Sequence, residues 1–211
     1  MMFQMNELLG EVVREAKQKK RSPDQKKFRA QKVIAEKELL DTGYDKRYPK
    51  LFDDVASYAA LWRMGFASTG YMLMGGTGCG KTEAVKRLSA MLRIEFVTTG
   101  ELMEAFGTPD YYRMIRQPDF FSGKPQALII DEIGTEPRPF IHFGTKYNVI
   151  ADVLRERYDA FKFHGARTIV TTNLCFEELA EAYGDRVESR CWEMFRSKQY
   201  SSDDFRKTAA C

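Results

Sequence analysis

One glycine-rich run in this chain has the residue types and spacing of a phosphate-binding loop. The run matches G-x-x-x-x-G-K-[ST] and lies between a predicted strand and a predicted helix. Glycines let the backbone curve so that its amide groups point at phosphate oxygens, and the start of the following helix adds positive potential. In this pattern Lys81 reaches the β- and γ-phosphates and the hydroxyl of Thr82 binds Mg2+. We expect a nucleoside triphosphate to contact the whole loop and the residue after it: Gly75, Gly76, Thr77, Gly78, Cys79, Gly80, Lys81, Thr82 and Glu83.

Two adjacent carboxylates follow the apolar run of residues 127–130. Asp131 at the end of that strand is expected to hold Mg2+ through water, and Glu132 to polarise the water that attacks the γ-phosphate. Read alone, the pair could equally be a polar strand end. Together with the loop it favours hydrolysis over a small-molecule kinase, and the sequence lacks the Asn-Lys-x-Asp guanine reader of a GTPase.

A polar residue also ends the predicted strand of residues 167–172. Asn173 could orient the attacking water or contact the γ-phosphate. Asn is also a common helix cap, and a helix is predicted to begin soon after, at Phe176. Both roles stay open at this point.

The elements around these residues alternate between strands and helices. Strands are predicted over residues 71–74, 94–98, 127–130 and 167–172, and helical apolar faces over 84–92 and 147–161. Thr98 and Glu101 have the spacing of a capping box at a helix start. This alternation predicts an α/β fold with a parallel sheet covered by helices on both faces, and with ligands at the carboxyl ends of the strands.

Composition limits the class of protein. The chain has 211 residues, 44% hydrophobic and 30% charged, as expected for one globular domain with an appendage. It contains no run of about 18 apolar residues and no apolar signal core, so we expect a cytoplasmic protein without a membrane span. Four scattered cysteines and two histidines have neither zinc nor disulfide spacing.

The formal net charge of +3 conceals a basic N-terminal segment. Residues 1–50 contain 13 Lys and Arg against 8 Asp and Glu, and most of the excess lies within residues 14–32. This basic run is either a solvated helical face or a nucleic-acid contact. Before it, Leu8, Leu9, Val12 and Val13 recur at helical spacing, as in a short amphipathic helix that could dock on a partner.

The order of motifs resembles a known family. The loop, Asp131-Glu132, residues 153–158, Thr171-Thr172-Asn173 and the Gly184-Asp185-Arg186-Val187-Glu188-Ser189-Arg190 segment are similar to the AAA+ ATPases of the DnaC/DnaI helicase-loader and IstB transposition-helper family. The resemblance covers roughly residues 50–207 and implies a P-loop NTPase (AAA+) fold with a short C-terminal helical segment. It divides the chain into a basic helical arm (1–50), an ATPase domain (51–207) and a tail (208–211).

The resemblance also implies roles for individual residues. Asn173 matches the sensor-1 position, and Arg190 matches an arginine finger that enters a neighbouring subunit's site, with Arg186 as the weaker candidate. Arg206 matches a sensor-2 phosphate contact within the same chain, although it could instead be a solvated tail charge. A finger of this kind implies a homo-oligomer with shared ATP sites.

The function implied is that of an ATP- and Mg2+-dependent ATPase that loads or remodels a replicative DNA helicase on single-stranded DNA during DNA replication. A transposition helper acting on duplex DNA and an ATP-switched adaptor with little hydrolysis are the alternatives. The proline-rich loop of residues 135–140 could face DNA through Arg138 and Phe140, or form a rigid surface turn.

Overall fold

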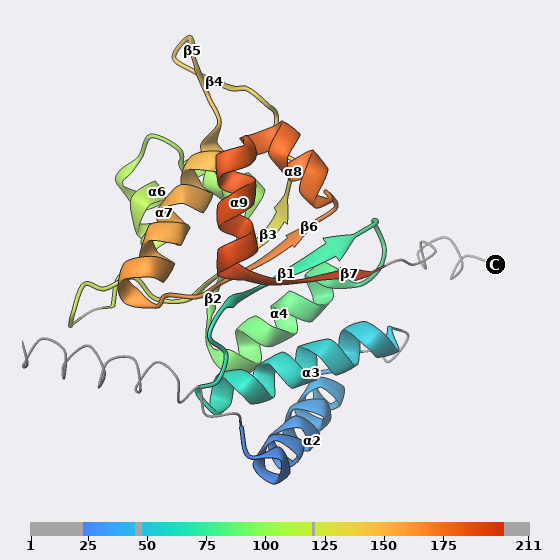
Figure 1. Ribbon diagram of the computed structural model, residues 1–211. Helices are drawn as coiled ribbons and strands as arrows, with labels where there is room; N and C mark the ends of the chain where they lie inside the picture. Colours follow the sequence, from blue (N-terminus) through green and yellow to red (C-terminus); the bar gives the residue numbers. More distant parts are fainter. Residues whose placement is uncertain (1–22, 45–47, 120, 201–211) are drawn as a thin grey trace, which may run out of the picture.

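A parallel sheet forms the centre of the molecule. The structure, a computed structural model, describes residues 23–44, 48–119 and 121–200. In this part of the chain five strands pair in the order β2-β3-β6-β1-β7, all in parallel (Figure 1). The strands are β1 (Gly70–Gly75), β2 (Glu95–Thr98), β3 (Leu128–Ile133), β6 (Thr168–Thr172) and β7 (Phe195–Tyr200). The predicted parallel α/β sheet is confirmed.

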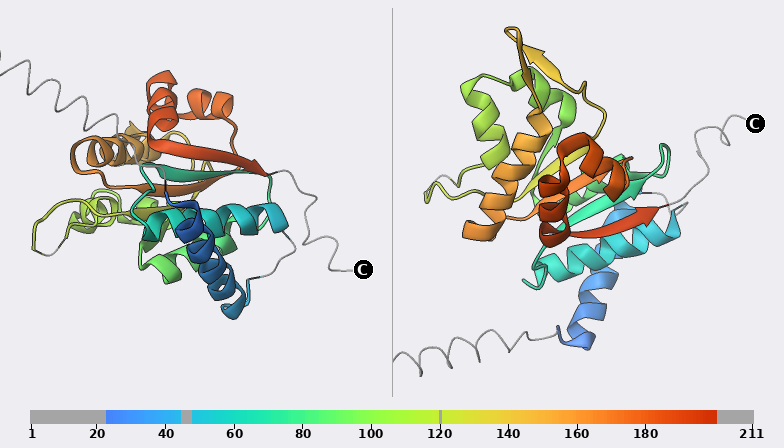
Figure 2. Two further views of the ribbon diagram at one scale, coloured as in Figure 1. Left: turned by 60° about the horizontal axis from the view of Figure 1, so that its bottom comes forward. Right: turned by 45° about the horizontal axis from the view of Figure 1, so that its top comes forward.

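Helices cover both faces of this sheet, as the alternation predicted (Figure 2). Neighbouring β1 residues face opposite ways: Tyr71 and Leu73 enter one apolar cluster, whereas Met72 and Met74 enter the other. The first cluster also contains residues of α2 (Gln25–Asp41), α3 (Pro49–Arg63) and α4 (Lys81–Leu92). The second contains residues of α5 (Thr99–Ala105), α6 (Pro109–Arg116), α7 (Val149–His164), α8 (Phe176–Tyr183) and α9 (Asp185–Met194). Burial on both sides explains why the central strands β1 and β3 contain continuous apolar runs.

The helix α5 begins with the predicted capping box. The Thr98 hydroxyl accepts from the Glu101 N–H at 3.1 Å, and the Glu101 carboxylate accepts from the Thr98 N–H at 2.6 Å. Each side chain therefore satisfies a main-chain donor that the first turn of a helix leaves without an intrahelical partner.

The edge strand β7 was not expected from the sequence. It pairs with β1 along its length, yet only its end residues Phe195 and Tyr200 are buried. Close approach depends on a glycine, because a Cβ at Gly75 would lie 2.0 Å from the Tyr200 carbonyl oxygen. Four partly exposed polar residues between two apolar ones do not resemble a buried strand, so periodicity did not reveal it.

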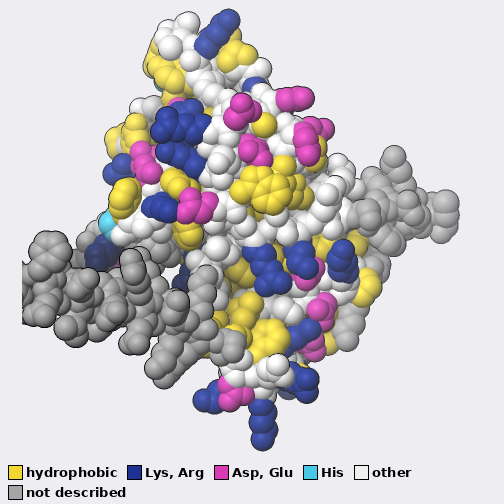
Figure 3. Space-filling model, in the orientation of Figure 1, with side chains coloured by type: hydrophobic (Ala, Val, Ile, Leu, Met, Phe, Trp, Pro, Cys, Tyr) yellow, Lys and Arg dark blue, Asp and Glu magenta, His cyan; other side chains and the backbone are white. Residues whose placement is uncertain are grey.

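The helix α2 packs on the body of the molecule through Ala35 and Leu39. Its exposed face carries Lys26, Lys27 and Arg29, and Lys and Arg side chains surround the end of the molecule that α2 forms (Figure 3). Lys32 of the same helix pairs with Asp53 of α3. The part of the basic run before residue 23, the amphipathic segment before it and the tail lie outside the described residues. The domain division at residue 50 and both readings of the basic run stay predictions.

A two-stranded hairpin, β4 (Phe140–His142) and β5 (Thr145–Tyr147), follows the proline-rich loop and projects from the top of the view in Figure 1. Two rings at the base of the hairpin pack against Phe106, with centroid distances of 5.7 Å for Phe140 and 4.9 Å for Tyr147. The Arg138 guanidinium lies 5.6 Å from the centre of the Tyr183 ring. Phe140 is partly buried by this packing, whereas Arg138 stays exposed. The DNA-facing role and the rigid surface turn both stay predictions.

No helix in the part of the chain that the structure describes is long and apolar enough to cross a membrane.

The largest fully buried side chain is a cation without a carboxylate partner among the described residues. The guanidinium of Arg157 donates to Thr168 Oγ1 at 2.8 Å, to the Ile115 carbonyl at 2.9 Å and to the Gln126 carbonyl at 2.7 Å. Burial lowers the pKa of Arg157 to about 10, so the group stays protonated at neutral pH. It joins the end of α6 to the starts of β3 and β6.

Arg157→Ala is therefore expected to lower the free energy of unfolding by about 3 kcal/mol or more, because several buried acceptors lose their donor at once. Arg155→Ala is the matched control on the same helix, since Arg155 is exposed and, within the described residues, forms its ion pair with Asp152 three residues away. The control should change stability by less than about 0.5 kcal/mol. Urea unfolding followed by circular dichroism measures both, and equal losses would contradict the structural role of Arg157.

Candidate nucleotide-binding site

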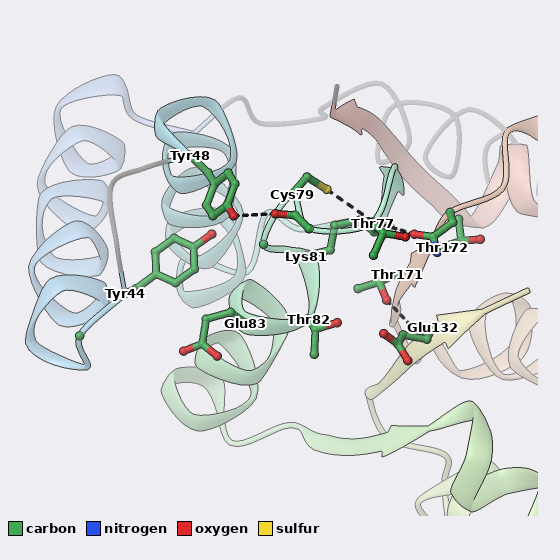
Figure 4. Close-up of a pocket in the computed structure, with 14 residues that line it drawn as sticks. Tyr44, Tyr48, Thr77, Cys79, Lys81, Thr82, Glu83, Glu132, Thr171 and Thr172 are labelled. Atoms are coloured by element: carbon green, nitrogen blue, oxygen red, sulfur yellow. Dashed lines mark hydrogen bonds between the residues drawn. The ribbon is translucent and has the colours of Figure 1, made fainter. Parts of the chain in front are cut away.

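The phosphate-binding loop connects β1 to α4 and lines a pocket of about 400 Å³, a size suited to a small ligand (Figure 4). Its curvature needs glycine, because Gly75, Gly78 and Gly80 have φ values of 136°, 84° and 83°. The pocket is also lined by Glu132, by residues 171–173 and by two tyrosines from the segment before α3.

Lys81 and Asn173, the candidate sensor-1 residue, contact each other in this pocket. Lys81 Nζ donates to the carbonyl oxygens of Gly75 and Gly76 at 2.6 and 2.9 Å, and to Asn173 Oδ1 at 2.9 Å. Lys81 and Asn173 are separated by 92 residues in sequence, and only the pairing of β1 with β6 brings them together. The ammonium group is thus held beside the loop, within reach of a phosphate chain bound there. Cys79 is buried, with its sulfur 3.5 Å from the same Nζ.

The two predicted metal ligands are also neighbours. The Thr82 hydroxyl lies in the first turn of α4 and donates to Asp131 Oδ1 at 3.3 Å. Asp131 is 2% exposed, and its main-chain carbonyl accepts from Thr99 Oγ1 at 2.9 Å, which anchors the end of β3. A hydroxyl and a carboxylate oxygen are hard ligands of the kind Mg2+ prefers, with water and phosphate oxygens completing its shell. The residues present therefore fit this ion.

The predicted base lies beside them but is exposed. Glu132 lines the pocket across from Thr82, and its main-chain N–H donates to Thr171 Oγ1 at 2.8 Å (Figure 4). Its φ of 63° is in the left-handed region, which is uncommon for a residue other than glycine. This geometry leaves the carboxylate able to contact a water molecule in the pocket, whereas the adjacent Asp131 is buried.

A family model described as IstB-like ATP binding protein matches residues 2–190. The chain belongs to this family. Among curated protein sequences none matches significantly.

Three solved structures are similar to this IstB-like protein at low sequence identity. A candidate primosome component from Streptococcus pyogenes serotype M3 has a TM-score of 0.51 and 16% identity, with 74% of this chain and 82% of that chain covered. The DnaC helicase loader has a TM-score of 0.46 and 20% identity, covering 69% and 89%. DnaI has a TM-score of 0.48 and 18% identity, covering 64% and 72%. The AAA+ P-loop fold predicted from the sequence is confirmed.

Two tyrosines of the IstB-like protein complete the pocket and were missed by the sequence analysis. The Tyr48 hydroxyl donates to the Gly78 carbonyl at 2.6 Å, and its ring covers Gly80, where a Cβ would lie 2.8 Å from the ring carbons. Tyr44 lines the pocket next to it (Figure 4). No local pattern indicates this contact, because the tyrosines lie about thirty residues before the loop in the sequence.

Tyr48→Ala is expected to weaken ATP binding by about tenfold, because the loop loses a packed wall and a polar contact together. Tyr48→Phe keeps the ring and should stay within about threefold of wild type. Titration with a fluorescent ATP analogue measures both. If the two variants bind equally weakly, the hydroxyl rather than the ring is what matters.

The candidate fingers do not reach this pocket. Arg190 lies on α9, where its guanidinium is 4.7 Å from the centre of the Tyr158 ring on α7. Arg190 and the exposed Arg186 line a separate hollow of about 540 Å³. A catalytic role for Arg190 therefore requires the pocket of another subunit. Arg206, the other predicted phosphate contact, lies outside the described residues.

Proposed function

We propose that this IstB-like protein hydrolyses ATP with Mg2+ and uses the cycle to load or remodel a replicative DNA helicase on single-stranded DNA. The observation that carries the ATPase proposal is the joining of Lys81 to Asn173 and of Thr82 to Asp131 around one pocket. These four residues come from three separate segments of the chain, and the parallel pairing of β1, β3 and β6 brings them to the same edge of the sheet.

The pocket supplies what phosphoryl transfer to water requires. Lys81 neutralises charge on the β- and γ-phosphates, and the Asn173 amide orients the terminal phosphate or the attacking water. Glu132 accepts the proton of that water as its oxygen bonds to the γ-phosphorus, while the bond from that phosphorus to the β–γ bridging oxygen breaks and ADP leaves. Thr82 and Asp131 would hold Mg2+, which would offset the negative charge of the phosphates.

The helicase as partner is supported by the segment from Gly184 to Arg190, whose pattern resembles helicase loaders. The S. pyogenes structure with the same fold is likewise described as a primosome component. The family description, IstB-like ATP binding protein, is consistent with the alternative of an IstB-like transposition helper acting on duplex DNA. The experiment must therefore compare helicase with transposase as the partner, and single-stranded with duplex DNA as the substrate.

The deciding experiment is native mass spectrometry of the full chain with the replicative helicase of its own host, with and without ATP. ATP-dependent complexes with the helicase, together with tighter binding of single-stranded than of duplex DNA, are expected. Binding of a host transposase and of duplex DNA instead would establish the helper function. Bound ATP that is never turned over, with or without DNA, would indicate a switched adaptor.

A further inference from the structure

The pairing of β3 with β6 is interrupted at the acidic pair. Ile130 lies opposite Val170 and Ile133 lies opposite Thr172, with a shift in register between them. Two residues of β3, Asp131 and Glu132, are therefore opposite a single residue of β6, Thr171. This is a β-bulge, a feature that redirects side chains and often borders active sites.

The bulge leaves Glu132 with an unusual backbone. At a φ of 63° its N–H donates to a side chain, Thr171 Oγ1, rather than to a strand carbonyl. A non-glycine residue in this region is strained, so a specific contact must maintain it. The Thr171 hydroxyl provides that contact and so maintains the backbone turn that places the Glu132 carboxylate in the pocket.

The same hydroxyl also contacts the other carboxylate. Thr171 Oγ1 donates to Asp131 Oδ1 at 2.5 Å. A hydroxyl has one hydrogen to donate, which goes to Asp131, and the oxygen accepts from Glu132. Thr171 is fully buried, so bulk water does not compete for either bond. One side chain therefore holds both members of the pair.

We propose that Thr171 is a positioning residue for ATP hydrolysis. It orients the Asp131 carboxylate toward Thr82 and holds the backbone that presents Glu132. The metal ligand Asp131 and the base Glu132 therefore keep fixed positions relative to each other. The proposal rests on the ATPase function proposed above. In the absence of such a role, Thr171 is a buried polar residue that merely completes a bulge, and removing it would cost only stability.

The test compares Thr171→Val, which keeps the shape without the hydroxyl, with Thr171→Ser, which keeps the hydroxyl. Thr168→Val is the matched control: Thr168 is a buried threonine at the opposite end of β6 whose hydroxyl accepts from Arg157. Three quantities are measured: kcat for ATP, the dissociation constant for a fluorescent ATP analogue, and the Mg2+ concentration at half-maximal Mg2+-dependent binding of that analogue. Melting temperature is recorded for each variant.

Thr171→Val should lower kcat by about 30-fold and raise the Mg2+ midpoint by about tenfold, with analogue affinity at saturating Mg2+ within about threefold. Thr171→Ser should stay within about threefold of wild type in all three quantities. Thr168→Val should lower the melting temperature while leaving kcat and the Mg2+ midpoint unchanged. If Thr171→Val fails to fold, Thr171→Ala takes its place with the same expectations.

The proposal is overturned if Thr171→Val keeps the wild-type kcat and Mg2+ midpoint, or if Thr171→Ser is as impaired as Thr171→Val. It is also overturned if Thr168→Val loses as much kcat for the same loss of melting temperature. A wild-type protein without turnover would refute the proposed ATPase function instead. The Mg2+ midpoint then decides the role of Thr171 by itself.

Discussion

Glu132→Gln is expected to lower kcat for ATP by about 10³-fold while leaving ATP affinity within about threefold. Glutamine has the same shape but cannot accept a proton from the attacking water. The carboxylate is exposed to the pocket and the main chain, not the side chain, makes the bond to Thr171, so the substitution should leave the bulge intact. Single-turnover phosphate release measures the rate, and calorimetric titration with ATP measures the affinity.

Glu95→Gln is the matched control for this variant. Glu95 is an exposed carboxylate at the start of β2, and the pocket lies at the carboxyl ends of the strands, so its removal should not change kcat. If Glu132→Gln hydrolyses ATP at the wild-type rate, Glu132 is not the base. If it loses nucleotide binding instead, its role is in holding the ligand.

Arg190→Ala is expected to lower kcat by about 10³-fold in the assembled protein, the lower end of the range for removing an arginine finger. Arg190 lies over Tyr158 and does not line the pocket of its own chain, so its effect on chemistry must be exerted in a neighbouring subunit. ATP affinity of the isolated subunit should therefore stay unchanged. Arg186→Ala, one turn earlier on the same helix, should have a much smaller effect.

Mixing two inactive variants tests the shared site directly. In an equal mixture of Glu132→Gln and Arg190→Ala, about a quarter of the sites combine an intact base with an intact finger from the neighbour. About a quarter of wild-type turnover should then return, although neither variant is active alone. A mixture that stays inactive, although native mass spectrometry shows mixed oligomers, would contradict a finger acting between subunits.

The features that could be predicted from the local sequence are those that depend on neighbouring residues along the chain. Glycines with positive φ are needed wherever the loop curves around a phosphate, so Gly75, Gly78 and Gly80 could be assigned from sequence. Strands buried on both faces are rich in apolar and β-branched residues, which located β1, β3 and β6. The helix cap formed by Thr98 and Glu101 spans only three residues and was equally visible.

The parts that required the folded chain are contacts between segments far apart in sequence. Tyr48 reaches Gly78 across 30 residues, and β7 is a strand only because it lies beside β1. No pattern within six polar-rich residues distinguishes such an edge strand from a loop, since pairing with a neighbour supplies its stability.

Asp131 and Glu132 depend both on local sequence and on the tertiary structure. Its residue types and its position after an apolar strand were enough to predict two carboxylates near a phosphate. Their unequal exposure, buried for Asp131 and open for Glu132, depends on the bulge opposite Thr171. The bulge is a property of two paired strands, because it exists only where the register of one shifts against the other.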